Sequence, residues 1–224
     1  MSDQEVQSTQ RFKVGEMTVE PGTPILTEGA HSAQLFTVLE GMGLRMKLLE
    51  NGSRQVTSFV FPGDLIGLQA AVMGEMSHTV EARTHMTLCV FDRAMLWDFF
   101  KNAPSRSYDL IWIGASEEHF LGEALATVGQ RNAEQAVAWA LVRLWGRASG
   151  LHLVGENGMQ LPYRQQDLAD SLGLSLVHTN KTLAKFRERQ LAVWRDGMLQ
   201  INDLETLARI GLTEPDGERR RPLL

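Results

Sequence analysis

The 224-residue chain contains a single cysteine, Cys89, and this scarcity excludes several kinds of site. One thiol cannot form an intramolecular disulfide, supply a four-cysteine iron–sulfur cluster within the chain, or build a cysteine-rich zinc site. Cys89 falls in a predicted strand, where a small buried hydrophobic residue is favoured over a redox switch. The chain is therefore expected to be neither disulfide-stabilised nor cluster-bearing.

Long apolar runs are also missing. The longest, such as Leu110–Ala115, fall far short of the roughly 20 residues that a membrane-spanning helix needs. The first residues, Met1–Gln10, are polar and contain no apolar signal core. The sequence therefore predicts a cytoplasmic protein with no membrane partner.

Positive charge is scarce in the chain as a whole. The formal net charge is −5, which at face value argues against a nucleic-acid partner. The scarcity is regional, because residues 1–129 hold 9 basic and 16 acidic side chains whereas residues 130–224 hold 13 and 11. Between Asn180 and Arg195, five basic side chains accompany one acidic side chain, Glu188. This asymmetry indicates that the two parts of the chain have different partners, and that the partner of the basic part is a polyanion. The alternative is that the basic side chains lie on a helix face that only contacts solvent.

The first hundred residues have the pattern of short strands separated by turn signals. Asn51-Gly52 marks a tight hairpin, and Pro62-Gly63-Asp64 marks another turn. Several short strands at this spacing are typical of an antiparallel barrel or sandwich. The expected strands are Leu35–Leu39, Gly43–Leu48, Gln55–Phe61, Thr79–Arg83 and Thr87–Phe91.

Helical patterns begin near residue 92. Arg93–Phe100 is a predicted short helix, and Pro104 suits the first turn of a longer one that extends from Ser105 to about Val128, or about 36 Å. Its apolar positions cover too much of its surface for a single contact. We expect one face to pack on its own domain and another to pair with a second copy; the alternative is a helix buried within one subunit. The expected dimerisation residues are Leu110, Ile113, Phe120, Leu121, Ala124, Leu125 and Val128.

A hinge is expected at Gly129 and Gln130. Asn132, followed three residues later by Gln135, predicts a capped helix start, and Gly150 ends that helix. The tail over residues 215–224 is expected to be frayed.

The most specific stretch is a pair of predicted helices in the back half. A short amphipathic helix over Gln165–Leu172 precedes Gly173, which permits a sharp turn, and Leu174, the expected buried turn residue. Ser175 can cap a second helix over residues 176–189. Two short helices joined by a short turn that contains glycine form a helix-turn-helix.

The second helix has the chemistry of a DNA-reading element. Asparagine can pair with adenine and lysine with guanine, and later basic residues contact phosphate. Its expected inner face holds Thr179, Leu183 and Phe186, although Thr179 or Thr182 is also considered for a thymine methyl or phosphate contact. The candidate DNA-binding residues are Ser175, Val177, His178, Asn180, Lys181, Lys185, Arg187 and Arg189.

A hairpin follows the second helix. Val193–Ile201 alternates around an Asp196-Gly197 turn, which predicts a two-stranded wing that adds contacts to the DNA backbone. The alternative for the whole stretch is a structural helical pair. The order of turn, cap, basic helix and wing favours DNA binding.

These features together resemble the CRP/FNR family of transcription regulators over roughly residues 12–212. The matching residues in the front half are Glu28-Gly29, Leu35-Phe36, Val38–Gly41 and Phe61–Gly67; Asp167–Ser175 matches in the back half. The resemblance implies an α+β fold with an N-terminal antiparallel β-roll of the cyclic-nucleotide-binding type, a long dimerisation helix and a C-terminal winged helix-turn-helix. The implied parts are a sensor domain over 1–103, a dimerisation helix and hinge over 104–129, and a DNA-binding domain over 130–224.

The sequence departs from relatives that bind cyclic AMP. In those relatives a Glu follows the Gly-Asp-x-Ile stretch and an Arg-Ser or Arg-Thr pair grips the cyclic phosphate; here Leu68 and Met76 stand at the Glu and Arg positions. Without the arginine a phosphate site loses its bidentate charged partner, and Arg83 lies too far along the chain to replace it. We expect no tight cyclic-AMP binding, and no metal or other cofactor. The degenerate effector pocket is expected at Gly63, Asp64, Gly67, Leu68, Met76 and Ser77.

Other branches of the family also differ from this chain. A single cysteine excludes the four-cysteine oxygen sensors, and no histidine spacing marks a haem ligand, although His78 and His85 lie near the expected pocket. In the second helix, Val177 and Lys181 stand where many relatives have Glu and Arg. Because lysine lacks the planar fork of arginine, the DNA half-site is expected to differ from the usual one.

The leading hypothesis is a dimeric regulator that binds a two-fold symmetric double-stranded DNA site, with RNA polymerase as a further partner. The alternative is a small-molecule or haem sensor that acts through protein partners. An enzyme is not expected, because the sequence shows no phosphate-binding glycine loop, nucleophile elbow or metal-ligand cluster.

Overall fold

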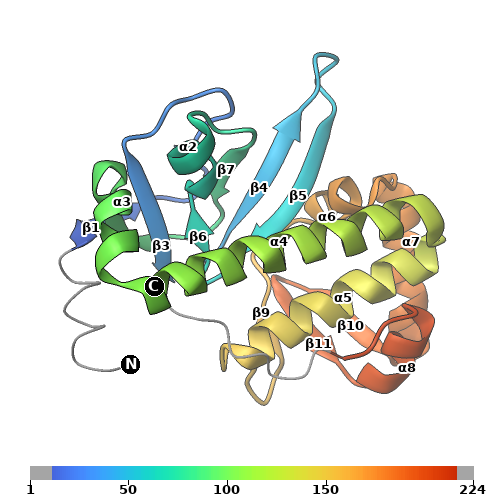
Figure 1. Ribbon diagram of the computed structural model, residues 1–224. Helices are drawn as coiled ribbons and strands as arrows, with labels where there is room; N and C mark the ends of the chain where they lie inside the picture. Colours follow the sequence, from blue (N-terminus) through green and yellow to red (C-terminus); the bar gives the residue numbers. More distant parts are fainter. Residues whose placement is uncertain (1–11, 216–224) are drawn as a thin grey trace. The chain divides into compact units, whose positions relative to one another are not determined.

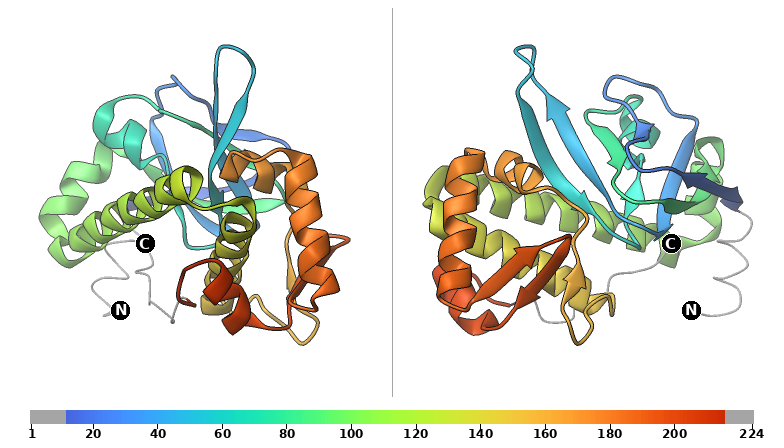
Figure 2. Two further views of the ribbon diagram at one scale, coloured as in Figure 1. Left: turned by 90° about the vertical axis from the view of Figure 1, so that its right-hand side faces the viewer. Right: turned by 180° about the vertical axis from the view of Figure 1, so that it is seen from behind.

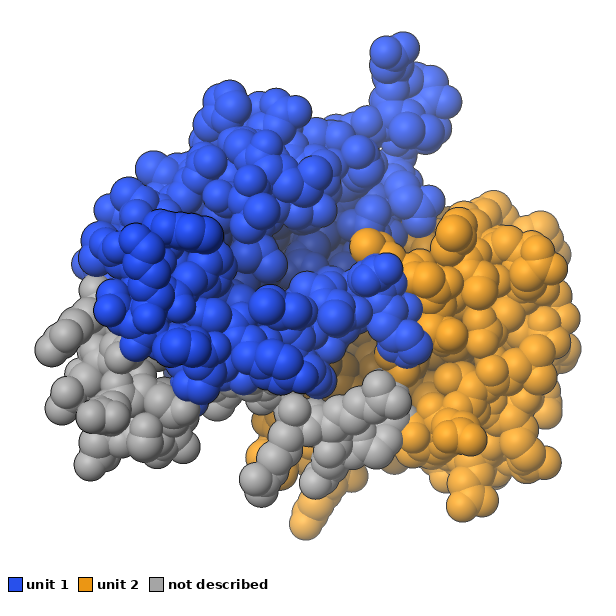
Figure 3. Space-filling view, in the orientation of Figure 1, with its two compact units in different colours: residues 1–119, 221–224 blue, residues 120–220 orange. Residues whose placement is uncertain are grey.

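The computed structural model describes residues 12–215, which form two compact units with a boundary between His119 and Phe120 (Figure 3). The polar start and the tail from residue 216, with its arginines, lie outside the described residues. The prediction of a frayed tail is therefore untested beyond residue 215. The three-part division expected from the sequence also stays a prediction.

The first unit is built on two four-stranded antiparallel sheets (Figure 1). The first sheet has the order β1-β8-β3-β6 and the second has the order β2-β7-β4-β5. The strands are β1 (Lys13–Val19), β2 (Pro24–Leu26), β3 (Gln34–Glu40), β4 (Gly43–Leu48), β5 (Arg54–Val60), β6 (Leu65–Ile66), β7 (Thr79–Ala82) and β8 (Met86–Asp92). The expected antiparallel β-roll is confirmed, and the five strands expected from the sequence lie within one residue of their predicted bounds.

Turn residues position the strands as their chemistry requires. β4 pairs with β5 from Gly43 opposite Val60 to Leu48 opposite Arg54, and Gly52 takes a positive φ of 81° in the connecting turn. Only glycine adopts such an angle without strain. The projecting β4–β5 hairpin is visible in both views of Figure 2.

Two apolar clusters hold the first unit together. The first lies inside the roll and includes Phe36, Val80 and Leu88. The second joins the other face of the β1-β8-β3-β6 sheet to the helices, with Phe12 stacked on Phe91 and on Phe99 at ring separations of 4.7 Å. The helical elements are α2 (Leu68–Met73), η1 (Arg93–Met95), α3 (Leu96–Asn102) and the start of α4 (Pro104–Gln130).

The second unit contains the end of α4 and a winged helix-turn-helix. Its elements are α5 (Ala133–Gly150), β9 (Met159–Gln160), α6 (Gln165–Leu172), α7 (Leu176–Glu188), β10 (Ala192–Arg195), β11 (Met198–Ile201) and α8 (Leu204–Ile210). Strands β10, β11 and β9 form an antiparallel sheet in that order. The capping box at α5 is confirmed, because Asn132 Oδ1 accepts from Gln135 N and Gln135 Oε1 accepts from Asn132 N, both at 3.0 Å.

Candidate DNA-binding face and sensor pocket

The turn between α6 and α7 has the geometry that its residues predict. Gly173 ends α6 in the left-handed conformation, with φ 65° and ψ 25°. Ser175 then caps α7, its Oγ accepting from His178 N at 3.3 Å and lying 3.1 Å from His178 Nδ1. Leu174 is half-buried rather than buried, which corrects the expectation for this position.

The buried face of α7 differs in part from the predicted one. Thr179, Thr182 and Phe186 are buried, whereas Leu183 is half-buried. The two threonine hydroxyls donate to carbonyls of the preceding turn, Thr179 to Ser175 O at 3.2 Å and Thr182 to His178 O at 3.0 Å. The expectation that either threonine contacts a base or phosphate is therefore wrong, because burial and helix bonding occupy both hydroxyls.

The opposite face of α7 is open near its start. Val177 is 62% exposed, and Ser175, His178, Asn180 and Lys181 are also exposed. A helix start that presents an apolar side chain, an amide and an amine has the groups needed to contact a thymine methyl, an adenine edge and a guanine edge. These five residues are among those that the sequence predicted, and the structure brings them together.

Two of the predicted phosphate contacts have a partner within the protein. Glu134, near the start of α5, contacts Lys185 Nζ through one carboxylate oxygen and Arg189 Nη1 through the other, the latter at 2.8 Å. The hydrogen bond from Lys185 is the largest cause that holds the pKa of Glu134 below its usual value, and the nearby charge of Arg189 adds to it. The two basic side chains therefore brace α7 against α5.

A shallow pocket of about 200 Å³ lies between α7 and the wing. Its lining includes Gln165, Asn180, Leu183, Arg187, Trp194 and Arg195. The wing itself turns through Asp196 and Gly197 with φ 51° and 72°, the pair of positive angles that the Asp-Gly sequence predicts. Sequence reasoning did not assign Gln165 or Arg195 to the site; the five-to-one basic stretch that ends at Arg195 was the available signal.

Helix α4 exposes a long row of apolar and small side chains. Ile111 is 67% exposed and Leu125 is 74% exposed, and Leu121 and Val128 are also exposed. Tyr108, one turn before Ile111, is exposed as well and was not predicted. Two expected dimerisation residues face elsewhere, because Leu110 and Ile113 are buried in the second apolar cluster of the roll.

Two further residues expected to form the dimer contact on α4 already pack within the protein, at least in part. Phe120 stacks on Trp139 of α5 with a ring separation of 6.1 Å, and Ala124 is half-buried. The apolar surface that is left on α4 is therefore narrower than the sequence predicted. It runs from Tyr108 through Ile111 to Leu125 and Val128, and we call it the exposed α4 row.

The segment expected to be a hinge is the last turn of α4. Gly129 and Gln130 are helical, and Arg131 then donates to Gly211 O at 2.9 Å, Leu212 O at 3.1 Å and Thr127 Oγ1 at 2.7 Å. The Arg131 guanidinium also lies 5.7 Å from the Trp139 ring. The end of α4 is thus fastened to α5 and to the residues that follow α8.

The expected effector pocket is filled largely by structural residues. Met76 is 1% exposed in the core of the roll, and Leu68 packs against the second apolar cluster. Asp64 is buried and its Oδ2 accepts from Phe61 N at 2.9 Å, which stabilises the turn through Gly63. Gly67 has φ 92° and a Cβ there would lie 3.2 Å from Gln34 O.

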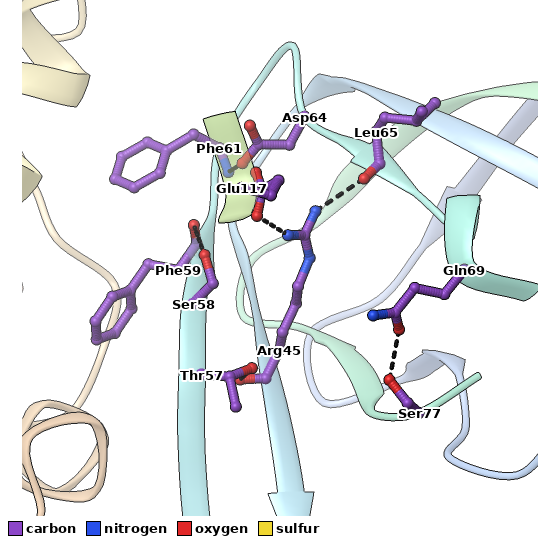
Figure 4. Close-up of polar contacts among 10 residues, drawn as sticks. All are labelled: Arg45, Thr57, Ser58, Phe59, Phe61, Asp64, Leu65, Gln69, Ser77 and Glu117. Carbon is purple, nitrogen blue, oxygen red and sulfur yellow. Dashed lines mark hydrogen bonds and ion pairs between the residues drawn. The ribbon is translucent and has the colours of Figure 1, made fainter. Parts of the chain in front are cut away.

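Polar groups do line the inner side of the β4–β5 sheet (Figure 4). Arg45 Nη1 contacts Glu117 of α4 at 2.5 Å, while its Nη2 donates to Leu65 O at 2.8 Å. Ser77 Oγ donates to Gln69 Oε1 at 2.6 Å. Arg45 thereby joins β4, β6 and α4 with a partly buried ion pair that the sequence did not reveal.

The two histidines considered near this pocket have different surroundings. Burial, together with the charges of Arg45 and Lys47, lowers the pKa of His78 to about 4, and the charge of Glu28 opposes this shift. His85 is exposed, and its Nδ1 lies 3.3 Å from Glu20 Oε1.

Over residues 12–215 no three His, Cys, Asp or Glu side chains gather as a metal site. In the same part of the chain, no helix is both long and apolar enough to span a membrane.

The fold and the exposed helix define a transcription regulator that joins a sensor-type roll to a DNA-binding winged helix. A family model for the cyclic nucleotide-binding domain matches residues 16–103, and one for the Crp-like helix-turn-helix domain matches residues 135–210. The nitrogen fixation regulation protein FixK of Rhizobium meliloti strain 1021 is 31% identical over 179 residues, which cover 80% of this chain and 78% of that protein.

Further relatives agree with this assignment. The transcriptional activatory protein AadR of Rhodopseudomonas palustris is 28% identical over 179 residues, covering 80% of this chain and 74% of that protein. The solved structure of FixK2 from Bradyrhizobium japonicum has the same fold, with a TM-score of 0.78 and 20% identity over 88% of this chain and 96% of that chain. The chain belongs to the CRP/FNR family of transcription regulators, and it is a DNA-binding regulator rather than an enzyme.

Proposed function

We propose that the protein acts as a homodimer that binds a two-fold symmetric DNA site through α7, without cyclic AMP and without an iron–sulfur cluster. The observation that carries this proposal is the exposed start of α7, where Val177, Asn180 and Lys181 project from a helix whose opposite face is buried. RNA polymerase is the expected second partner, and the cytoplasm remains the expected compartment.

Base recognition follows from the side chains at the start of α7. Asn180 can bind adenine with two hydrogen bonds, and Lys181 can donate to guanine acceptors. Val177 carries no acceptor for a cytosine amine, so a thymine methyl is its natural contact. The half-site is therefore expected to differ from one read by glutamate and arginine at positions 177 and 181.

Dimerisation is supported by the exposed α4 row. Tyr108, Ile111 and Leu125 are large side chains that are each at least two-thirds exposed on one helix. Ala115 and Gly122 lie seven and fourteen residues after Tyr108, and the exposed Glu118 lies midway between Ile111 and Leu125. Two α4 helices can approach closely along such a row, because the small residues leave room for the neighbouring large ones.

The side chains that fill the expected effector pocket of the roll support the proposal that the protein acts without cyclic AMP. Met76 occupies the core where a phosphate-binding arginine would have to emerge, and Leu68 is packed away from the inner wall. A dissociation constant for cyclic AMP below about 10 μM, in the range of roughly −7 kcal/mol or tighter, would contradict this part of the proposal. Isothermal titration calorimetry on the full chain measures it directly.

Selection of DNA from a random pool, followed by footprinting of the selected duplex, tests the proposed mode of binding. The expected footprint has two inverted half-sites whose centres lie about one helical turn, or about 34 Å, apart. An asymmetric footprint or a single protected half-site would contradict the symmetric dimer. Sedimentation of the unbound protein provides the matched measurement of oligomeric state.

A further inference from the structure

The basic side chains of the DNA-binding unit fall into two groups. Lys185 and Arg189 both contact Glu134, as described above. By contrast, Lys181, Arg187 and Arg195 have no carboxylate partner among residues 12–215. A side chain that is already paired gives less to a new anion, because the first partner must be displaced. The second group is therefore the one available to DNA.

Two members of the available group line the same pocket. Arg187 comes from the later half of α7 and Arg195 from the end of β10, and the pocket between them also receives Gln165 and Asn180. Leu183 and Trp194 form its apolar wall, and Trp194 is buried, which fixes the strand that carries Arg195. Two guanidinium groups and two amides around one shallow pocket present many N–H donors to whatever enters it.

The chemistry of this lining fits a phosphate group. Arginine binds phosphate oxygens through a planar fork, and an anion between two arginines also relieves their mutual repulsion. Asn180 and Arg187 are seven residues apart and so lie on one face of α7, which places the pocket beside the residues proposed to read bases. A bound DNA strand that passes the start of α7 can therefore present its backbone to this pocket.

We propose that Gln165, Arg187 and Arg195 bind one DNA backbone phosphate in each protomer, in the pocket that the base-reading Asn180 also lines, and that Glu134 keeps Lys185 and Arg189 out of the interface. This inference rests on the proposed DNA-binding function and deepens it. It reassigns two of the residues expected to touch phosphate, and it adds Gln165 and Arg195 to the site. The pocket fixes the register of the wing on the duplex, while α7 reads the sequence.

The salt dependence of binding tests this proposal in the full-length protein. Each phosphate contact adds roughly 0.9 to the slope of log K against log salt concentration, so removing one phosphate contact from each of the two protomers lowers the slope by about 1.8. Because Arg187 and Arg195 share one phosphate, we expect the double variant Arg187→Ala/Arg195→Ala to lower the slope by this amount on the selected duplex between about 50 and 200 mM salt, and each single variant to lower it by part of this amount. Lys185→Ala and Arg189→Ala remove the same charge, and they are expected to leave the slope unchanged.

The outcomes separate this proposal from the one on which it rests. If the wild-type protein selects no DNA site, the proposed function fails. If it binds a site but Lys185→Ala and Arg189→Ala lower the slope while Arg187→Ala and Arg195→Ala do not, only the phosphate site is overturned. Arg187→Gln keeps a long polar side chain and should reproduce the slope of Arg187→Ala, which guards against a folding defect.

A second arm distinguishes DNA phosphate from free phosphate. Part of the chloride is replaced by inorganic phosphate at constant ionic strength, and the affinity for the selected duplex is measured again. We expect the same affinity in both buffers, because the duplex supplies the phosphate together with its other contacts. A weakening in inorganic phosphate that disappears in Arg187→Ala would show that the free anion competes with the DNA backbone for this pocket, and it would support the phosphate site. A weakening of the same size in Arg187→Ala would place the competing anion elsewhere and would count against the site.

Discussion

The two units differ in how their basic residues are paired. In the roll, Arg45 pairs with Glu117, Lys47 with Glu28 at 3.0 Å, and Arg106 with Asp109 at 2.9 Å. In the DNA-binding unit, Lys181 and Arg195 project without a carboxylate partner among residues 12–215. The roll contains basic residues that hold its own elements together, and the winged helix contains unpaired basic residues that we propose contact DNA.

This difference explains why the net charge of the chain is a poor guide to its partner. The balance of −5 over the whole sequence does not reveal the surface proposed to bind DNA, because the basic side chains of that surface are clustered locally and unpaired. The difference also shows that a count of the basic residues along α7 does not tell how many of them are available to bind DNA. Glu134, which lies 51 residues before Lys185, removes two of them from the available set.

The largest effect is expected from disruption of the exposed α4 row. Ile111→Glu together with Leu125→Glu places like charges where two helices are proposed to meet, so the dimer should dissociate. A monomer loses the gain from binding two half-sites at once, a loss of about 10²–10⁴-fold in affinity for the symmetric duplex. Sedimentation and a DNA titration measure the two consequences together.

Val72→Glu is the matched control for that variant. Val72 is 66% exposed in α2 of the same unit, but it lies off the α4 row. It should leave both the oligomeric state and the DNA affinity unchanged. A double α4 variant that stays dimeric would rule out the exposed row as the interface.

The next largest effect is a loss of stability when the ion pair between Arg45 and Glu117 in the roll is broken. Arg45→Met leaves Glu117 without its partner and the Leu65 carbonyl without its donor, which should lower the free energy of unfolding by about 2–3 kcal/mol. Urea unfolding followed by circular dichroism measures this loss. Lys13→Met breaks a pair with Glu16 on the exposed edge strand and should change the stability little. Equal losses in the two variants would refute a special role for the Arg45 pair.

A pH dependence of stability should follow from His78. Its pKa is lowered to about 4 in the folded protein, below the ordinary value of about 6.5, so between these two values the unfolded chain binds the extra proton. Stability should therefore fall as the pH drops from about 6.5 to about 4, by on the order of 2 kcal/mol, and His78 should add no further loss below that range.

His78→Gln is the variant that isolates this contribution, because it keeps a polar side chain that does not titrate. The difference in unfolding free energy between wild type and variant should narrow as the pH falls from neutral towards 4. Arg45, Lys47 and Glu28 are the charged groups that act on His78. A difference that does not vary with pH would contradict the assigned surroundings of His78.

Much of the fold could be predicted from local signals. The Asn-Gly and Asp-Gly turns, the Asn132 cap and the Gly173 turn each depend on residues a few positions apart, and each formed as expected. Strands β2, β6 and β9 and helix α2 escaped prediction, because elements of two to six residues carry too little periodicity. Helix α8 has seven residues and was missed for the same reason. Strand β1 was also missed, although it has seven residues.

The parts of the site that could not be predicted depend on contacts between distant segments. Leu110 and Ile111 are adjacent apolar residues, yet the first is buried in the roll and the second is exposed, and only the packing of α4 decides which. The partnership of Glu134 with Lys185 and Arg189, and the pocket shared by Arg187 and Arg195, likewise join separate elements. Sequence alone therefore located the DNA-binding helix but not the division of its charges.

The central claim is that the exposed start of α7 reads DNA. Its most direct test is the affinity of Lys181→Ala for the selected duplex and for the same duplex with single base changes. We predict a loss of about 1–3 kcal/mol and relaxed discrimination at one position of each half-site. Lys101→Ala removes the same charge from α3 in the roll and should bind like the wild type. Unchanged affinity and unchanged base preference in Lys181→Ala would contradict the claim.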